Sequence, residues 1–177
     1  MWCIVSKKGD FHLGIHYFPP DYRPDLPEGE PMIAPLHSPS LIREAVCHPS
    51  VFPWVAAVED PEEFVWEPSR WHFALGAWDG DEYLGCFIFE IRNPRLVEAH
   101  VALLPKAWGP RAKQAGEEAI RWVFKLTRFE RIHAAVSVRN RAALAYVERV
   151  GMTPWGKAPR SSSKGDDQIF FGISKEA

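Results

Sequence analysis

The chain has 177 residues, of which 25% are charged and 46% hydrophobic, and its formal net charge is −2 at pH 7. These values are ordinary for a soluble globular protein, and the length favours one domain that is large enough to bury a core. A slightly acidic chain argues against a nucleic-acid partner, because proteins dedicated to that role are usually strongly basic.

The cysteines and the apolar segments bear on the compartment. Cys3, Cys47 and Cys86 are far apart and odd in number, which favours reduced thiols in the cytosol. The first residues hold too short an apolar run for a signal peptide, and no stretch approaches the roughly 18 apolar residues that a membrane span needs. We therefore expect a cytoplasmic protein with no membrane partner.

Proline is concentrated in the first part of the chain, where eleven of the sixteen prolines precede residue 70. Because proline removes a backbone donor and fixes φ, we expect residues 1–70 to form an irregular covering segment of one domain, 1–177. Within it, the sequence predicts a hairpin over 2–18, an extended loop over 19–39, and short helices near 38–46 and 61–66. His12 and His16 lack a carboxylate or cysteine cluster, so no metal site is predicted.

Residues 71–177 alternate strand and helix patterns. Three successive strands joined by tight turns are expected at 71–78, 83–92 and 96–104, followed by a helix that begins at about Arg111. Further strands are expected at 131–138, 154–156 and 168–173, with a helix at 141–150 between the first two. This order predicts an α/β (α+β) fold with a mixed, mostly antiparallel sheet flanked by helices.

The stretch Leu96–Phe124 organises the rest of the chain. It reads as a strand, a loop containing Pro105 and Trp108-Gly109-Pro110, and then a helix with small residues on one side. The first N–H groups of a helix lack partners and the helix dipole is positive there, so this arrangement favours a bound phosphate. Taken alone the pattern is weak, because most α/β crossovers contain it.

The residues that follow make the pattern more specific. Glu98, Pro105 and Trp108-Gly109 precede the helix, and Asn140 and Gly151-Met152 bracket the next one. This arrangement resembles the GNAT N-acetyltransferase superfamily, in particular its branch that acts on protein N-termini and small amines. The similarity runs without a gap from Glu98 to Met152, and to about 71–174 with the flanking strands.

The resemblance implies acetyl-CoA as cosubstrate and a set of residues that would bind it. The implied cofactor-binding residues are Leu103, Leu104, Lys106, Trp108, Gly109, Arg111, Ala112, Asn140 and Arg141. Two features depart from the family: Pro110 lacks an N–H, and Arg111 stands where glycine is usual. Arg111 could compensate by gripping phosphate oxygens, and Asn140 also suits a plain helix N-cap.

Three residues are candidates for catalysis. Glu98 holds the acidic position of the family, and strand alternation puts His100 on the same face; the alternative is an edge-strand charge beside a satisfied histidine. Glu90 is a weaker alternative base. Tyr146 could protonate the leaving thiol, although the family tyrosine falls at Val147, so a core-edge role is the competing interpretation.

The sequence thus predicts an N-acetyltransferase that moves an acetyl group from acetyl-CoA to a primary amine by direct attack. The acceptor, a small molecule or a peptide, is not identified, and the oligomeric state, including a homodimer, is left open. Pro110, Arg111 and the displaced Tyr146 motivate the alternative of a catalytically reduced GNAT-fold binding or structural protein.

Overall fold

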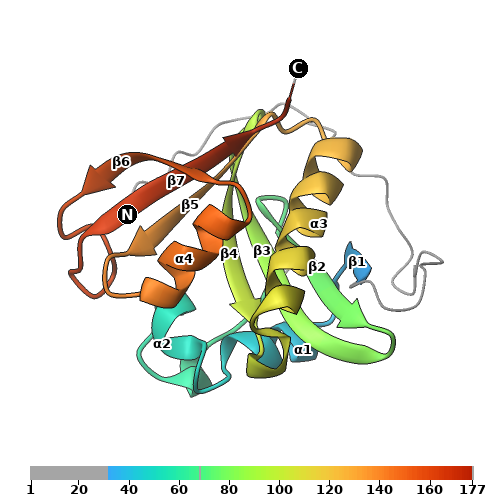
Figure 1. Cartoon of the computed structure of the whole chain (residues 1–177). Coiled ribbons are helices and arrows are strands. Elements are labelled where there is room, and N and C mark those ends of the chain that lie inside the picture. Colours follow the sequence, from blue (N-terminus) through green and yellow to red (C-terminus); the bar gives the residue numbers. More distant parts are fainter. Residues whose placement is uncertain (1–31, 68, 177) are drawn as a thin grey trace.

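The computed structural model describes residues 32–67 and 69–176, which form a mixed sheet with helices on both faces (Figure 1). The strand order is β1-β2-β3-β4-β5-β7-β6, and among the described strands the β4–β5 pair is parallel whereas the other pairs are antiparallel. The strands are β1 (Met32–Pro35), β2 (His72–Asp79), β3 (Glu82–Asn93), β4 (Leu96–Leu103), β5 (Arg131–Ser137), β6 (Thr153–Ala158) and β7 (Gln168–Ser174). The predicted fold class is confirmed.

The helices divide between the two faces of the sheet. They are α1 (Pro39–Val46), α2 (Phe52–Val55), α3 (Pro110–Leu126) and α4 (Arg141–Arg149), with single 3-10 turns η1 (Pro61–Glu63) and η2 (Pro105–Ala107). Neighbouring residues of β3 show the division, because Phe87 packs with α3 and α4 whereas Cys86 packs with α1 and α2. Side chains alternate along a strand, so these two clusters lie on opposite faces.

Helix α3 packs closely because its inner face is made of small residues. Ala112, Ala115, Gly116 and Ala119 are all buried against the sheet, and Val123 continues the same stripe. Small side chains let a helix axis approach a sheet, and burying them costs little side-chain entropy. The predicted small-residue face of this helix is confirmed.

Strands β4 and β5 begin together and then separate. They pair only over Leu96–Glu98 and Arg131–His133, although β4 continues to Leu103 and β5 to Ser137. Figure 1 shows both strands starting at the upper end and diverging toward the first turn of α3. The backbone groups along this divergence do not pair across it, so an extended ligand could add hydrogen bonds there.

The described part of the proline-rich segment is more regular than predicted. Met32–Pro35 lies within the expected loop but forms strand β1, which pairs antiparallel with β2. Proline is tolerated there because β1 is an edge strand, where one side of the backbone needs no ladder partner. The helix entry at Ser38 is as expected, since its Oγ accepts from the Leu41 N–H at 3.4 Å. The hairpin predicted over 2–18 lies outside the described residues.

The four-residue helix α2 was not predicted, because so short an element leaves no periodic pattern and contains Pro53. The short helix predicted near 61–66 is only the single 3-10 turn η1, with Asp60 Oδ1 accepting from the Glu62 N–H at 2.8 Å. Among the described helices, none has both the length and the apolar character that crossing a bilayer requires.

Candidate active site

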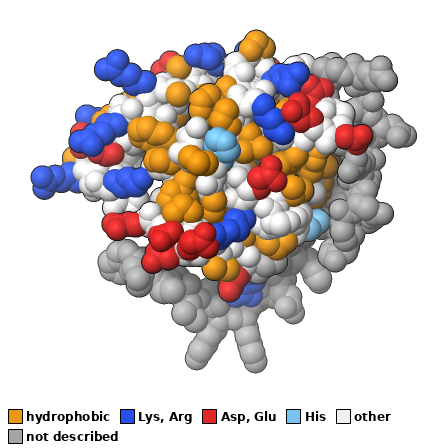
Figure 2. Space-filling model, turned by 90° about the horizontal axis from the view of Figure 1, so that it is seen from below, with side chains coloured by type: hydrophobic (Ala, Val, Ile, Leu, Met, Phe, Trp, Pro, Cys, Tyr) orange, Lys and Arg blue, Asp and Glu red, His pale blue; other side chains and the backbone are white. Residues whose placement is uncertain are grey.

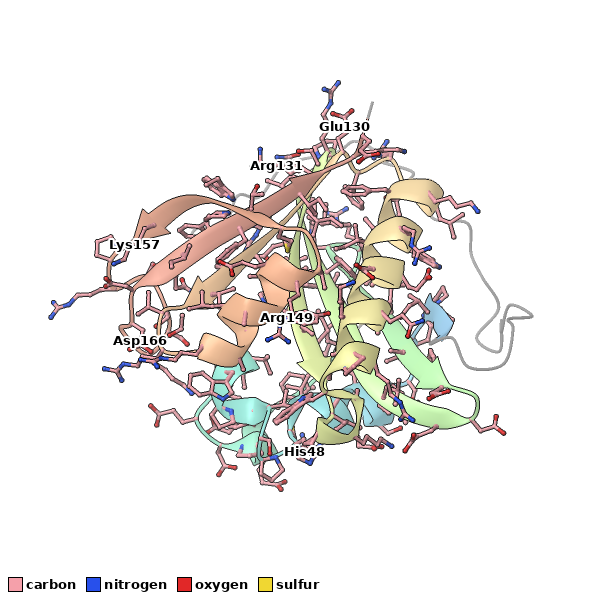
Figure 3. The ribbon with its side chains drawn as sticks, in the orientation of Figure 1. His48, Glu130, Arg131, Arg149, Lys157 and Asp166 are labelled. Atoms are coloured by element: carbon pink, nitrogen blue, oxygen red, sulfur yellow. The ribbon has the colours of Figure 1, made fainter. Side chains whose placement is uncertain are left out.

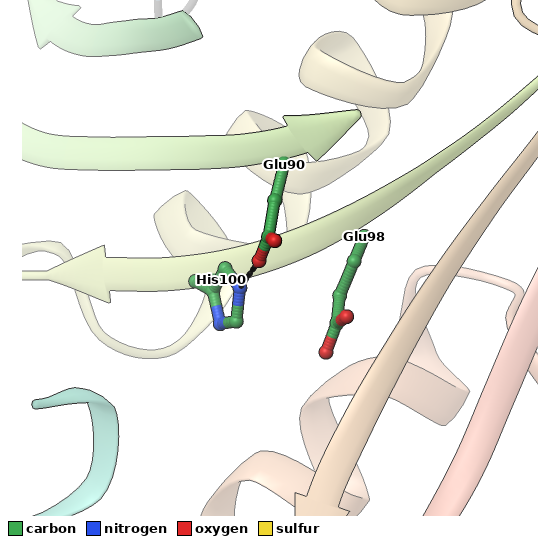
Figure 4. A group of neighbouring side chains, drawn as sticks. All are labelled: Glu90, Glu98 and His100. Carbon is green, nitrogen blue, oxygen red and sulfur yellow. Dashed lines mark ion pairs between the residues drawn. The ribbon is translucent and has the colours of Figure 1, made fainter. Parts of the chain in front are cut away.

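Glu98 and His100 lie on the face of β4 that points away from α3 and α4. Their neighbour Val97 is buried in the core beneath α3, so alternation places the two titratable side chains opposite it. Register extends this arrangement across the sheet, because Glu90 of β3 and His133 of β5 both pair with Glu98. Figure 4 shows Glu90, Glu98 and His100 converging on one space, with His100 Nε2 4.0 Å from Glu90 Oε2.

Arg92 holds the two carboxylates together. Its Nε donates to Glu98 Oε2 at 2.7 Å, its Nη2 also contacts that oxygen, and its Nη1 donates to Glu90 Oε1 at 2.7 Å. The register between β3 and β4 shifts between Ile91 and Asn93, and Arg92 lies in this irregularity. A guanidinium fork suits two acceptors, so Arg92 offsets the repulsion between Glu90 and Glu98.

These contacts decide which group can accept a proton. Burial disfavours the charged form of Glu98, but contacts with His133 and Arg92 and the charge of His100 outweigh burial and lower its pKa to about 2. His133 Nε2 lies 3.3 Å from Glu98 Oε2 without the alignment of a regular hydrogen bond. Glu98 is therefore ionised at neutral pH and is a weak base.

His100 has the opposite character. Burial lowers its pKa from the ordinary value, and although Glu98 and Glu90 oppose this, Arg92 adds to the lowering. The imidazole is therefore neutral at pH 7 and free to take up a proton. Of the two groups predicted on this strand, Glu98 therefore carries the fixed negative charge and His100 is the neutral group beside it.

One ligand atom from each of Glu90, Glu98 and His100 lies within 4.8 Å of the others, a spacing that a metal ion could bridge. Both carboxylates, however, already pair with Arg92. The guanidinium already neutralises one of the two carboxylate charges, which weakens the attraction of the cluster for a cation.

Tyr146 lies on the other side of the sheet, packed between α4 and α3. A Cβ on Gly116 would lie 2.2 Å from the Tyr146 hydroxyl, so the glycine makes room for it. A cavity of about 30 Å³ adjoins the ring and is lined by Ala99 and Val101 of β4 and Ala134 of β5. Tyr146 thus borders the region where β4 and β5 diverge, with its hydroxyl against Gly116 of α3.

The hydroxyl of Tyr146 is buried and has no hydrogen-bond partner among the described residues. Burial raises the pKa of Tyr146, and the charge of Glu117 adds to the rise, so the phenol keeps its proton. An unpartnered buried hydroxyl costs about 1–3 kcal/mol. A ligand with an acceptor atom in this space would recover that cost.

Replacing Tyr146 by Phe is expected to raise the melting temperature of the ligand-free protein, because it removes the unpartnered hydroxyl. Tyr83→Phe provides the matched control: the Tyr83 hydroxyl donates to the Leu41 carbonyl at 3.1 Å, so its loss should lower the melting temperature. Thermal denaturation of both variants measures whether each melting temperature rises or falls relative to the wild-type protein. Equal losses in both would show that Tyr146 has a hidden partner.

The predicted phosphate-binding end is formed by η2 and the start of α3. Gly109 has φ 92° and ψ −137°, a conformation that glycine adopts readily, and it precedes a first turn without an acidic residue or a side-chain cap. The backbone N–H of Lys113 bonds to the Gly109 carbonyl at 3.3 Å, so Arg111 and Ala112 provide the uncommitted amides of this turn.

Two predicted backbone contacts are partly occupied. The Leu104 N–H donates to the Leu84 carbonyl at 2.9 Å, which leaves only its carbonyl for a ligand. The Leu103 carbonyl accepts from Trp108 Nε1 at 3.0 Å. A carbonyl has two lone pairs, so Leu103 could still accept a second bond.

The basic side chains predicted to bind the cofactor have other partners at present. Arg111 pairs with Asp79 and Glu82 at 3.3 Å each, and Lys106 pairs with Glu82 at 3.5 Å. These exposed pairs are worth little, so a phosphate could replace them. At α4, Asn140 Oδ1 accepts from the Ala143 N–H at 3.0 Å as a cap, and Arg141 is exposed beside it.

Viewed from the end where α1, α2 and the start of α3 lie, apolar side chains gather at the centre of the surface and Lys and Arg along one edge (Figure 2). Trp54 and Trp108 are exposed apolar residues of these elements. Such a surface suits a ligand that carries both a ring and phosphates.

Sequence reasoning missed two residues of the cluster. His133 reaches Glu98 only because β4 and β5 pair in one particular parallel register, and no local pattern reveals that register. Arg92 could have been found from the sequence, since it follows Glu90 by two residues and alternation puts both on one face. The acidic partners of Arg111 come from the β2–β3 hairpin and leave no mark in the α3 sequence.

The fold and the site together define an acyltransferase of the kind in which β4 and β5 diverge ahead of a helix N-terminus. The family profile described as Acetyltransferase (GNAT) domain matches residues 31–153. The chain belongs to this family and is an acyltransferase, and the resemblance drawn from the sequence is confirmed. No curated protein matches the sequence.

Solved structures show the same fold at low sequence identity. Spermidine N-acetyltransferase from Vibrio cholerae, in complex with CoA and spermine, has a TM-score of 0.68 at 15% identity over 83% of this chain and 96% of that chain. Ribosomal-protein-S5-alanine acetyltransferase from Vibrio fischeri has a TM-score of 0.62 at 15% identity, over 84% and 95%. A probable GNAT-family acetyltransferase from Chromobacterium violaceum has a TM-score of 0.66 at 18% identity, over 85% and 93%.

Proposed function

We propose that this protein transfers an acetyl group from acetyl-CoA to a primary amine by direct attack. The observation that carries the proposal is the position of Glu98 and His100 at the point where β4 and β5 stop pairing. The α3 N-terminus lies at the open end of this divergence, and the charged cluster at its closed end. A donor anchored at α3 would extend its thioester along β4 toward the cluster.

Two protons leave the nitrogen and one bond is exchanged. An alkyl ammonium has a pKa of about 10 and must give its first proton to a base before it can attack. The neutral amine nitrogen then attacks the thioester carbonyl carbon, the C–S bond breaks, and the second nitrogen proton ends on the sulfur, which leaves as a thiol. His100 takes the first proton, and the ionised Glu98 stabilises the imidazolium that results.

Tyr146 would act from the opposite face of the sheet. Its hydroxyl stays protonated and is without a partner in the described structure, and Tyr146 lines the same cavity as Ala99 and Ala134. It can donate to the leaving sulfur, whose thiol pKa of roughly 8.5 calls for only modest acid assistance. Base and acid would then approach the thioester from two sides.

A second candidate is a GNAT-fold protein that binds the donor but transfers slowly. Two features favour it: Pro110 removes one amide from the phosphate-binding turn, and Arg111 is paired with Asp79 and Glu82. The neutral His100 beside an ionised Glu98 supports the catalytic candidate, since a binding protein has no need of a proton acceptor there. The rate of acetyl transfer from acetyl-CoA to an amine distinguishes the catalytic candidate from the binding candidate.

Donor binding can be measured by thermal shift. Acetyl-CoA at 100 times its dissociation constant should stabilise the fold by about 2.7 kcal/mol, which raises the melting temperature by about 5–10 °C. Dephospho-CoA should give a smaller shift if Arg141 contacts the ribose phosphate, and Arg141→Gln should remove that difference. Equal shifts with both ligands in both proteins would remove Arg141 from the site, and no shift at all would refute donor binding.

A further inference from the structure

Arg131 begins β5 on the same sheet face as Glu98 and His133. It pairs in register with Leu96, while His133, two residues along, pairs with Glu98. The Arg131 guanidinium lies against Gly172 of β7, and Gly172 pairs with His133. The guanidinium is therefore in the row of Glu98 and His133, on the side of His133 away from β4, while His100 lies two residues further along β4.

The guanidinium of Arg131 is held in place without a carboxylate. It stacks on Trp155 at 5.6 Å, and in the described part of the chain it forms no ion pair. A Cβ on Gly172 would lie 2.9 Å from Arg131 Nη2, so the glycine lets the guanidinium lie against β7. Trp155 in turn stacks on His133, with ring centroids 6.4 Å apart.

Arg131 also lines a cavity of about 690 Å³ at the upper end of the sheet. Figure 3 shows Arg131 and Glu130 at this end, far from His48 at the other. The charged lining residues are Arg95, Arg131 and Lys175 against Glu130 and Glu176, and Glu130 already pairs with Arg95 at 3.3 Å. The cavity therefore carries a small excess of positive charge beside the cluster.

We propose that Arg131 binds a carboxylate on the acceptor, so that the substrate is an amine with a carboxylate several bonds away. This inference rests on the proposed transfer to an amine. The guanidinium fork matches a carboxylate in geometry, and the side that does not rest on Gly172 and Trp155 is available to one. The amine would then reach His100 while the acid end stays at Arg131.

The charges of the same face differ between its two ends. Glu90 and Glu98 carry two negative charges and Arg92 carries one positive charge, so the cluster keeps one net negative charge for the amine end of an acceptor. Arg131 places a positive charge on the other side of His133. A substrate with an amine at one end and a carboxylate at the other matches both charges, whereas the far ammonium of a diamine would meet the charge of Arg131.

Three amines of equal length test this inference: 6-aminohexanoate, hexylamine and 1,6-diaminohexane, whose far ends are negative, neutral and positive. Six bonds span about 7 Å, and a hydrogen bond of about 3 Å at each end extends the reach to about 13 Å, enough for the diagonal of about 12 Å across two strand spacings and two strand residues. The wild-type protein should acetylate 6-aminohexanoate with a kcat/KM about 10–100-fold above that of hexylamine, and diaminohexane should be poorest. Arg131→Gln should abolish the preference, and Arg131→Lys should keep part of it.

Arg70→Gln is the matched control, because Arg70 stacks on Trp71 at 5.0 Å in the same way but lies outside the cavity. It should leave the preference intact. Calorimetric binding of 6-aminohexanoate to the CoA-saturated protein adds a readout without turnover, and Arg131→Gln should weaken it. A preference that survives Arg131→Gln, or equal rates for all three amines, would overturn the carboxylate site while leaving acetyl transfer standing. Arg131-dependent binding without any transfer would instead refute the proposed reaction.

Discussion

Replacing His100 by Asn is expected to lower kcat/KM for acetyl transfer by about 10²–10⁴-fold, the usual contribution of a positioned general base. The expectation follows from the position of His100 beside Glu90 and Glu98 and from its lowered pKa, which keeps the imidazole neutral at pH 7. In the wild-type protein, kcat/KM should fall on the acid side as His100 becomes protonated. The variant should lack this acid limb.

His48→Asn is the control for the histidine substitution. His48 lies at the end of α1, where its Nδ1 accepts from the Ser50 N–H at 3.2 Å, and Figure 3 places it far from β5's first residues. Its replacement should change kcat/KM by less than about threefold. If His100→Asn retained both turnover and the acid limb, the proton would have to pass to another group.

Replacing Arg92 by Gln is the second large expected effect, and it acts on stability and on pH dependence together. Arg92 pairs with both Glu90 and Glu98, so its loss leaves a mostly buried carboxylate without its main partner. Leaving one partner of such a pair unsatisfied costs about 1–3 kcal/mol, or roughly 2–10 °C in melting temperature. Arg121→Gln, which breaks an exposed pair with Glu118 on α3, should cost less than about 1 kcal/mol.

The pH effects of Arg92→Gln have defined signs. Arg92 lowers the pKa of His100, so its removal should raise that pKa and move the acid limb of kcat/KM to higher pH. The depressed pKa of Glu98 contributes stability above its unfolded value of about 4.3, and this is lost as pH falls toward about 2. In the variant this contribution should be smaller, and its loss should be complete at a higher pH, because the onset is set by the unfolded pKa and only the folded pKa rises. An unshifted acid limb would mean that Arg92 acts only on stability.

The strand, loop and helix around Leu96–Phe124 could be predicted because each leaves a local mark. Pro105 and Gly109 interrupt the strand, and the small residues of α3 follow the period of a helix. Strand alternation also sufficed to put Glu98 and His100 on one face. These are the features for which the neighbours in sequence are the neighbours in space.

The chemistry of the site could not be predicted because it depends on residues brought together across strands. Glu98 looks like a base by its position, yet contacts with His133 and Arg92 keep it ionised, and for this reason we propose His100 as the proton acceptor. The irregularity near Asn93 and the register of β5 decide these contacts. The edge strand β1 was missed for a similar reason, since its hydrogen bonds come from β2 and override the proline signal.

A crystal structure of the protein with CoA tests the account most directly. We expect the diphosphate at the backbone N–H groups of Arg111 and Ala112, and the sulfur between Ala99 and Ala134 within reach of the Tyr146 hydroxyl. A complex in which the Trp108 indole remains on the Leu103 carbonyl and CoA lies elsewhere on the protein would contradict the proposed transfer.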